Sequence, residues 1–114
     1  MSFLLRWLDL KRDRRAVGLR PHRDLVLAVP YDRAYDRVLT AVDATLGAHV
    51  ALDDRPGGTI EAAFGLINSE RVRCTLRARD AGTTEIRIEA FFAAGISRPH
   101  SEAVDALAAE LARG

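Results

Sequence analysis

Four arginines alternate with other residues along one stretch of the chain, and a fifth follows in the next stretch. A guanidinium presents a planar fork of donors that binds carboxylates and phosphates through paired hydrogen bonds. Alternate side chains of a strand project from the same face, so these side chains should share one face of a sheet. The row is a candidate face for an anionic partner, and it consists of Arg71, Arg73, Arg77, Arg79 and Arg87.

Acidic side chains interleave with this row at Glu61, Glu85 and Glu89. A surface that binds phosphates normally excludes internal acids, and Phe91 is the single aromatic residue expected on this face. The pattern therefore favours a solvated ladder of ion pairs and disfavours nucleic acid as a partner, although binding of nucleic acid through the arginines is kept as an alternative.

Other residue types that carry chemistry are few and scattered. The three histidines, His22, His49 and His100, lie far apart and at no metal-ligand spacing with Cys74. The alternation predicts that Cys74 is a small buried hydrophobe. The serines occupy predicted turns or caps. We expect no metal, no cofactor, no catalytic residue and no enzymatic activity.

The N-terminus has the spacing of a short amphipathic helix over residues 1–12. A linker is expected over residues 13–23, where Gly18 and Pro21 interrupt the helical pattern. Residues 1–23 carry seven basic and two acidic side chains, a net charge of +5, whereas the whole chain has +1. The apolar side of the helix is expected to be the contact surface, with Phe3, Leu4, Trp7 and Leu8 as its members.

Three functions are compatible with this N-terminus and with the rest of the chain. The first is a non-enzymatic interaction module, which forms a homo-oligomer such as a homodimer or binds another protein. Its N-terminal helix would dock on its own sheet or on the sheet of a partner. In that case Trp7 and Phe3 would cover Phe91. The second is peripheral association with an anionic membrane surface. The third is a small binder of hydrophobic ligands, with a cavity between the sheet and the C-terminal helix.

Strict period-two alternation over residues 59–92 predicts a sheet with one apolar and one charged face. A turn at 55–57 would set Leu52 opposite Ile60 and Val50 opposite Ala62. A turn at 68–70 would set Ala62 opposite Leu76 and Glu61 opposite Arg77. A turn at 80–82 would set Arg77 opposite Glu85 and Arg73 opposite Glu89, with Gly82 as a left-handed residue.

Helical spacing predicts one helix of about sixteen residues after Pro30, ending at Gly47, and a second helix after Ser101. A short strand over residues 25–29 precedes the first helix. The fold class is therefore α+β, in the order strand, helix, four-stranded antiparallel meander and helix. The curved sheet packs on helices, in a single domain over residues 24–113 with the N-terminal amphipathic helix added.

This order resembles a single copy of the fold in each half of the TATA-binding protein, and it is similar to the core of helix-grip proteins. The resemblance rests on topology alone, and no signature motif of either family is present.

Composition agrees with one domain of ordinary size. The 114 residues are 48% hydrophobic and 29% charged, as in a soluble globular protein. The N-terminus has no apolar run of a signal peptide, and the single cysteine allows no disulfide within the chain. We therefore expect a cytoplasmic protein, and the excess of arginine over lysine is typical of a GC-rich bacterial genome.

Overall fold

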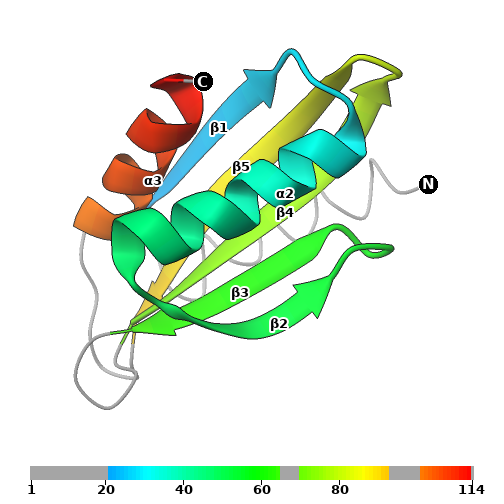
Figure 1. The fold of residues 1–114 in the computed structure, drawn as a ribbon. Coiled ribbons are helices and arrows are strands. Elements are labelled where there is room, and N and C mark those ends of the chain that lie inside the picture. Colours follow the sequence, from blue (N-terminus) through cyan, green and yellow to red (C-terminus); the bar gives the residue numbers. More distant parts are fainter. Residues whose placement is uncertain (1–20, 65–69, 93–100, 114) are drawn as a thin grey trace, which may run out of the picture.

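The computed structural model describes residues 21–64, 70–92 and 101–113, which form an α+β fold (Figure 1). The predicted N-terminal helix and most of its linker lie outside these residues. In chain order the elements are β1 (His22–Leu27), α2 (Tyr31–Ala41), a π-helical turn η1 (Val42–Leu46), β2 (His49–Asp54), β3 (Thr59–Phe64), β4 (Glu70–Asp80), β5 (Thr83–Phe92) and α3 (Glu102–Arg113).

The five strands form one antiparallel sheet in the order β1-β5-β4-β3-β2. The chain thus makes a meander from β2 to β5, and β1 pairs with the last strand of that meander. Both α2 and α3 lie on the same face of the sheet (Figure 1). This arrangement confirms the predicted fold class, and it leaves the other face without a described helix.

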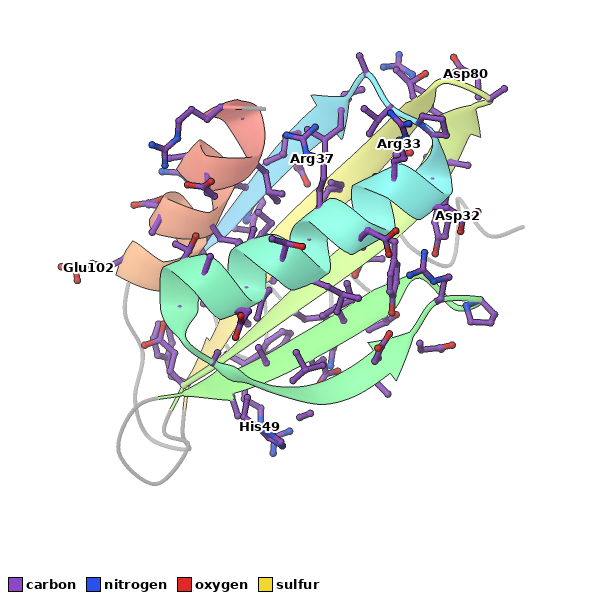
Figure 2. All side chains as sticks on the ribbon, viewed as in Figure 1. Asp32, Arg33, Arg37, His49, Asp80 and Glu102 are labelled. Carbon is purple, nitrogen blue, oxygen red and sulfur yellow. The ribbon has the colours of Figure 1, made fainter. Side chains whose placement is uncertain are left out.

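The core fills the space between the sheet and the two helices. It contains Tyr35, Val38 and Val42 from the first helical segment and Val104, Leu107 and Leu111 from α3, packed on the inward row of the sheet (Ile60, Ala62, Val72, Cys74, Leu76, Ile86, Ile88 and Ala90). The helices also contact each other, because the Arg37 guanidinium in α2 donates to the carbonyl oxygen of Leu111 at 2.9 Å; Figure 2 labels Arg37 between α2 and α3.

The helix boundaries follow the predicted signals. Pro30 caps α2, and its carbonyl accepts the first helical hydrogen bond, from Ala34 N–H at 2.9 Å. Gly47 ends the helical segment in the left-handed region at φ 57°. Ser101 caps α3, since its hydroxyl oxygen accepts a hydrogen bond from Val104 N–H at 3.2 Å. The first strand differs from the prediction, because it begins at His22 and ends at Leu27.

The register between β4 and β5 is as predicted, with Arg77 opposite Glu85 and Arg73 opposite Glu89. The turn itself differs, because Gly82 does not have a positive φ. Instead, the Asp80 carboxylate accepts a hydrogen bond from Gly82 N–H at 2.8 Å and holds the turn closed.

The register between β3 and β4 was predicted wrongly. Ala62 lies opposite Val72, and Glu61 lies opposite Arg73 and not Arg77. β3 ends at Phe64 and β4 begins at Glu70, so the connection between them is longer than the predicted three residues. The error amounts to an even number of residues, so each side chain still projects from its predicted face.

Between β2 and β3, Val50 lies opposite Ala62 as predicted, but Leu52 does not face Ile60. A bulge between Val50 and Leu52 shifts the pairing by one residue, so that Leu52 lies opposite Glu61 and Asp53 lies opposite Ile60. The bulge therefore turns Leu52 to the charged face and Asp53 toward α2.

Candidate interaction surface

The sheet face opposite α2 and α3 is called the open face below. The described part of the chain places no helix or further strand over it (Figure 1). Strand alternation assigns to it His22, Asp24 and Val26 of β1; Glu85, Arg87, Glu89 and Phe91 of β5; Arg71, Arg73, Thr75, Arg77 and Arg79 of β4; Thr59, Glu61 and Ala63 of β3; and His49 and Leu52 of β2. All five predicted arginines are therefore on one face.

Two glutamates each hold a pair of these arginines on β4. Glu61 accepts a hydrogen bond from Arg73 Nε at 2.9 Å and lies 4.0 Å from an Arg71 terminal nitrogen. Glu85 accepts a hydrogen bond from Arg77 at 2.8 Å and lies 3.8 Å from Arg79 Nε. The ladder of ion pairs expected from the sequence is thus present, although Glu61 belongs to Arg73 and not to Arg77.

Arg87 binds the carboxylate of Asp24 across the β1–β5 pair. Its Nε and a terminal nitrogen donate to the two carboxylate oxygens at 2.7 and 3.0 Å. These hydrogen bonds, followed by the positive charge of Arg87, hold the pKa of Asp24 below its ordinary value. The pKa of Arg87 is raised, chiefly by the same hydrogen bonds. The pair joins the first strand to the last.

Every one of the five guanidiniums therefore already has a carboxylate within 4.0 Å. An anionic ligand would have to displace these carboxylates or bind beside them. The longest ion pairs involve Arg71 and Arg79, whose side chains are 58% and 59% exposed. These two ends of β4 are the part of the row with the weakest internal pairing, and they are far apart along the strand.

One end of the open face combines an aromatic ring and a buried alanine with an ion pair. The guanidinium carbon of Arg73 lies 4.6 Å from the centre of the Phe91 ring, in a cation–π contact. Ala63 is 6% exposed, although it does not belong to the core beneath the helices. The Glu61 side chain is only 17% exposed. We call this set the Phe91 patch, with Glu61, Ala63, Arg73 and Phe91 as its members.

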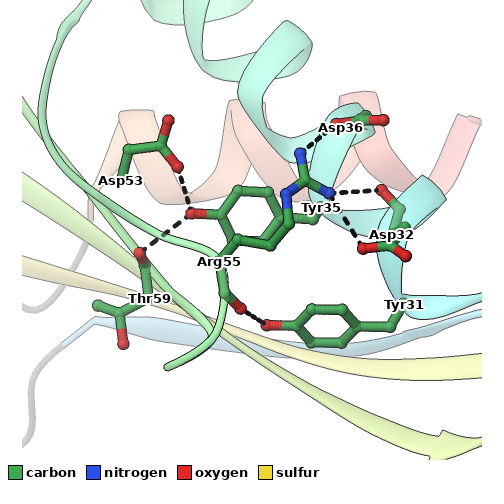
Figure 3. A network of polar contacts seen from close by, with 7 residues as sticks. All are labelled: Tyr31, Asp32, Tyr35, Asp36, Asp53, Arg55 and Thr59. Carbon is green, nitrogen blue, oxygen red and sulfur yellow. Dashed lines mark hydrogen bonds and ion pairs between the residues drawn. The ribbon is translucent and has the colours of Figure 1, made fainter.

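A second polar cluster joins the hairpin between β2 and β3 to α2 (Figure 3). The Tyr35 hydroxyl donates to Asp53 Oδ1 at 2.5 Å, and the Tyr31 hydroxyl donates to the carbonyl oxygen of Arg55 at 2.6 Å. The Arg55 guanidinium lies over the Tyr35 ring at 4.4 Å. It also pairs with Asp36 at 2.6 Å and, more loosely, with a second carboxylate of the helix at 3.3 Å, that of Asp32.

This cluster was not predicted from the sequence, because Tyr31 and Tyr35 fit an apolar helical stripe and Asp53 and Arg55 fit a hairpin turn. Burial, and then the hydrogen bond to Asp53, raise the pKa of Tyr35 well above its ordinary value. Tyr35 therefore stays protonated near neutral pH and acts as a hydrogen-bond donor. The cluster has the properties of a structural clasp between hairpin and helix.

The remaining candidate chemistry is dispersed. Burial raises the pKa of the Cys74 thiol to about 12, so the thiol stays protonated and unreactive. His49 lies on the open face as predicted, whereas His22 lies in β1 and not in a loop. Across the described ranges, no three His, Cys, Asp or Glu side chains are grouped as metal ligands would be.

Phe3, Leu4, Trp7 and Leu8 lie outside the described residues, so the structure does not place the predicted contact helix. None of the described helices is both long and apolar enough to cross a lipid bilayer. Comparison of the sequence with models of known protein families and with curated proteins finds no match in either case. The function is therefore argued from the open face itself.

Proposed function

We propose that this chain is a small non-enzymatic interaction module that self-associates through the helix predicted over residues 1–12. The support comes from the open face, which is one complete side of a five-stranded sheet. When helices pack on one face of a sheet, the other face contacts solvent or a further layer of structure. The strand order is also compatible with the resemblance to a single TATA-binding-protein-like or helix-grip unit, which remains part of the proposal.

The observation that carries the proposal is the Phe91 patch. A solvated ladder of ion pairs does not explain why this face contains a phenyl ring and a buried alanine. Ala63 is nevertheless buried on this face, and the ring of Phe91 is half-buried beneath Arg73. An apolar contact bordered by charged side chains is typical of a surface that binds protein, because apolar contact supplies affinity and the charged border supplies orientation.

The charges of the open face favour a protein surface over a polyanion as its partner. Asp24, Glu61 and Glu85 pair with the five arginines, so the row does not present a continuous positive field. Binding of a nucleic acid or of an anionic membrane would instead gain most from unpaired basic side chains. The basic residues 1–23 keep the membrane alternative open, and acidic liposomes test it.

The test of self-association is the mass in solution, measured by light scattering on the full chain and on a variant lacking residues 1–19. The described core begins at Pro21 and contains both helices and all five strands, so this variant is expected to fold. A dimer that becomes a monomer on truncation supports the proposal. A mass that is unchanged by truncation contradicts it.

A matched pair of full-length variants separates the apolar contact from the charge of the segment. Leu4→Ser with Leu8→Ser removes apolar side chains and should yield a monomer. Arg6→Ser with Asp9→Ser removes one charge of each sign and should leave the dimer intact. Loss of the dimer in the second variant alone would point to an electrostatic contact and would overturn the proposed role of the leucines.

A further inference from the structure

Exposure differs along the open face. Ala63 of β3 is 6% exposed, whereas Thr75 of the adjacent central strand is exposed and also points away from the helices. On the edge strand β1, opposite Glu85 and thus toward the other end of the face, Val26 is 48% exposed. Val26 lies on the edge strand β1 and has one neighbouring strand, whereas Ala63 and Thr75 each lie between two strands. Ala63 is much less exposed than Thr75 in spite of this equivalent position, as an additional layer over the Phe91 patch would make it.

The path of the chain brings the N-terminal segment to this end of the face. His22 lies opposite Glu89, and the carbonyl oxygen of Pro21 accepts a hydrogen bond from Ala90 N–H at 3.0 Å. The chain thus enters the sheet beside Phe91, the next residue of β5. Adjacent strands are about 4.8 Å apart, so residue 20 starts within a few such spacings of the patch.

The connecting segment is long enough for this contact. Residues 13–20 can span up to about 26 Å when extended. The patch extends from β5 to β3, and β3 is three strand spacings, or about 14 Å, from β1, so the segment can reach all of it. A tethered segment has an effective concentration in the millimolar range for a site that its linker can reach. The same chain is therefore favoured over a second copy as the source of the covering segment.

The chemistry of residues 1–12 fits the patch. Phe3 and Trp7 are one helical turn apart, so a helix presents both rings together, to Phe91 and to the guanidinium of Arg73. We propose that residues 1–12 of the same chain dock on the Phe91 patch through Phe3 and Trp7. The inference deepens the proposed function, since the adjacent Leu4 and Leu8 are then left to contact a second copy.

Tryptophan fluorescence of the full chain tests this docking, because Trp7 is the single tryptophan. Its emission should be blue-shifted and protected from acrylamide, independently of protein concentration. Phe91→Ser should shift the emission to the red and raise the quenching constant several-fold. Val26→Ser makes the same kind of change at the exposed edge of the open face, and it should alter neither property.

A second variant guards against misfolding of Phe91→Ser. Ala63→Gln adds a side chain on the open face, outside the core, and should also expose Trp7 while far-ultraviolet circular dichroism stays unchanged. Equal exposure of Trp7 in the wild type and in Phe91→Ser would overturn the inference. Protection that disappears on dilution would also overturn it, because the docked segment would then come from another copy.

The mass of the same samples separates this inference from the proposed function. A monomer in which Trp7 is protected from acrylamide, and loses this protection in Phe91→Ser, would support the docking and refute self-association. A dimer in which Trp7 is exposed would support self-association and refute the docking.

Discussion

Replacing Tyr35 by phenylalanine tests whether the clasp of Figure 3 stabilises the fold as its geometry implies. Tyr35 is buried, and its hydroxyl donates to Asp53 at 2.5 Å. The substitution removes only this hydroxyl. The ring remains in the core, and the Arg55 guanidinium can still lie 4.4 Å above it. Any loss of stability therefore reports on the hydrogen bonds of this hydroxyl, the one to Asp53 and a longer one of 3.4 Å to the carbonyl oxygen of Thr59.

A hydrogen bond to a charged group typically contributes about 1.5–3 kcal/mol. Asp53 is exposed, so water can replace the hydroxyl and reduce the loss. We expect Tyr35→Phe to lower the free energy of unfolding by about 1–2 kcal/mol at neutral pH. Tyr31→Phe is the control, because its half-buried hydroxyl donates to a neutral carbonyl oxygen at 2.6 Å, and its cost should be smaller, about 0.5–1 kcal/mol.

The raised pKa of Tyr35 also predicts how the difference in stability between wild type and Tyr35→Phe changes with pH. Since the pKa of Tyr35 is raised in the folded protein, the unfolded chain loses this proton first when the pH rises above about 10. The stabilisation is complete below the unfolded pKa and decreases above it, by up to about 1.4 kcal/mol per pH unit. Tyr35→Phe lacks this term, so its deficit relative to wild type should shrink between about pH 9 and about pH 11.

Urea unfolding followed by circular dichroism measures both effects. The contribution of Cys74, whose pKa is also raised, is present in both proteins and cancels in the difference. A wild-type protein and a Tyr35→Phe variant of equal stability at neutral pH would refute the clasp. A deficit that stays constant up to about pH 11 would refute the raised pKa.

Three further predictions concern the turns, the ladder and the core. Gly47→Ala should lower the free energy of unfolding, measured by thermal unfolding, by about 1–2 kcal/mol, and Gly58→Ala should lower it by much more. Both glycines have a positive φ, but only at Gly58 would the new Cβ lie 2.3 Å from a backbone oxygen. Equal losses of stability would refute this close approach. Glu61→Gln should cost about 1 kcal/mol and Glu85→Gln at most about 0.5 kcal/mol in urea unfolding, because Glu61 is the less exposed; the reverse order would contradict this. A thiol reagent should label Cys74 only as fast as the protein unfolds, and rapid labelling of the folded protein would show that this thiol is accessible.

The sheet face of each side chain was predicted better from the sequence than its cross-strand partner. Alternation alone places Ala62 inward and Glu61 outward, and any even shift keeps them there. Which arginine meets Glu61 depends on the length of the connection between Phe64 and Glu70, and turn signals at Asn68 and Ser69 did not determine that length. The turn after Asp80 is shorter, and there the partners were predicted correctly.

The clasp could not be predicted, because it depends on the bulge that turns Asp53 toward α2. Alternation without a bulge places Asp53 on the other face. One signal was available in the spacing of Asp32 and Asp36, which stand one turn apart on α2 and pair with the same guanidinium. An acidic pair of this kind next to an expected hairpin containing Arg55 favours a contact between the two elements.

Paramagnetic relaxation measured with a nitroxide at position 6 (Arg6→Cys) tests the central claim, which is that the N-terminal segment docks on the open face of its own chain. The buried Cys74 thiol should remain unlabelled. The docking predicts stronger broadening of the amide signals of Ala63 and Phe91 than of Val26, and this difference should persist when chains that are both spin-labelled and isotopically enriched are diluted with chains that are neither. Loss of the broadening at Ala63 and Phe91 on dilution, or its absence in the undiluted sample, would contradict it.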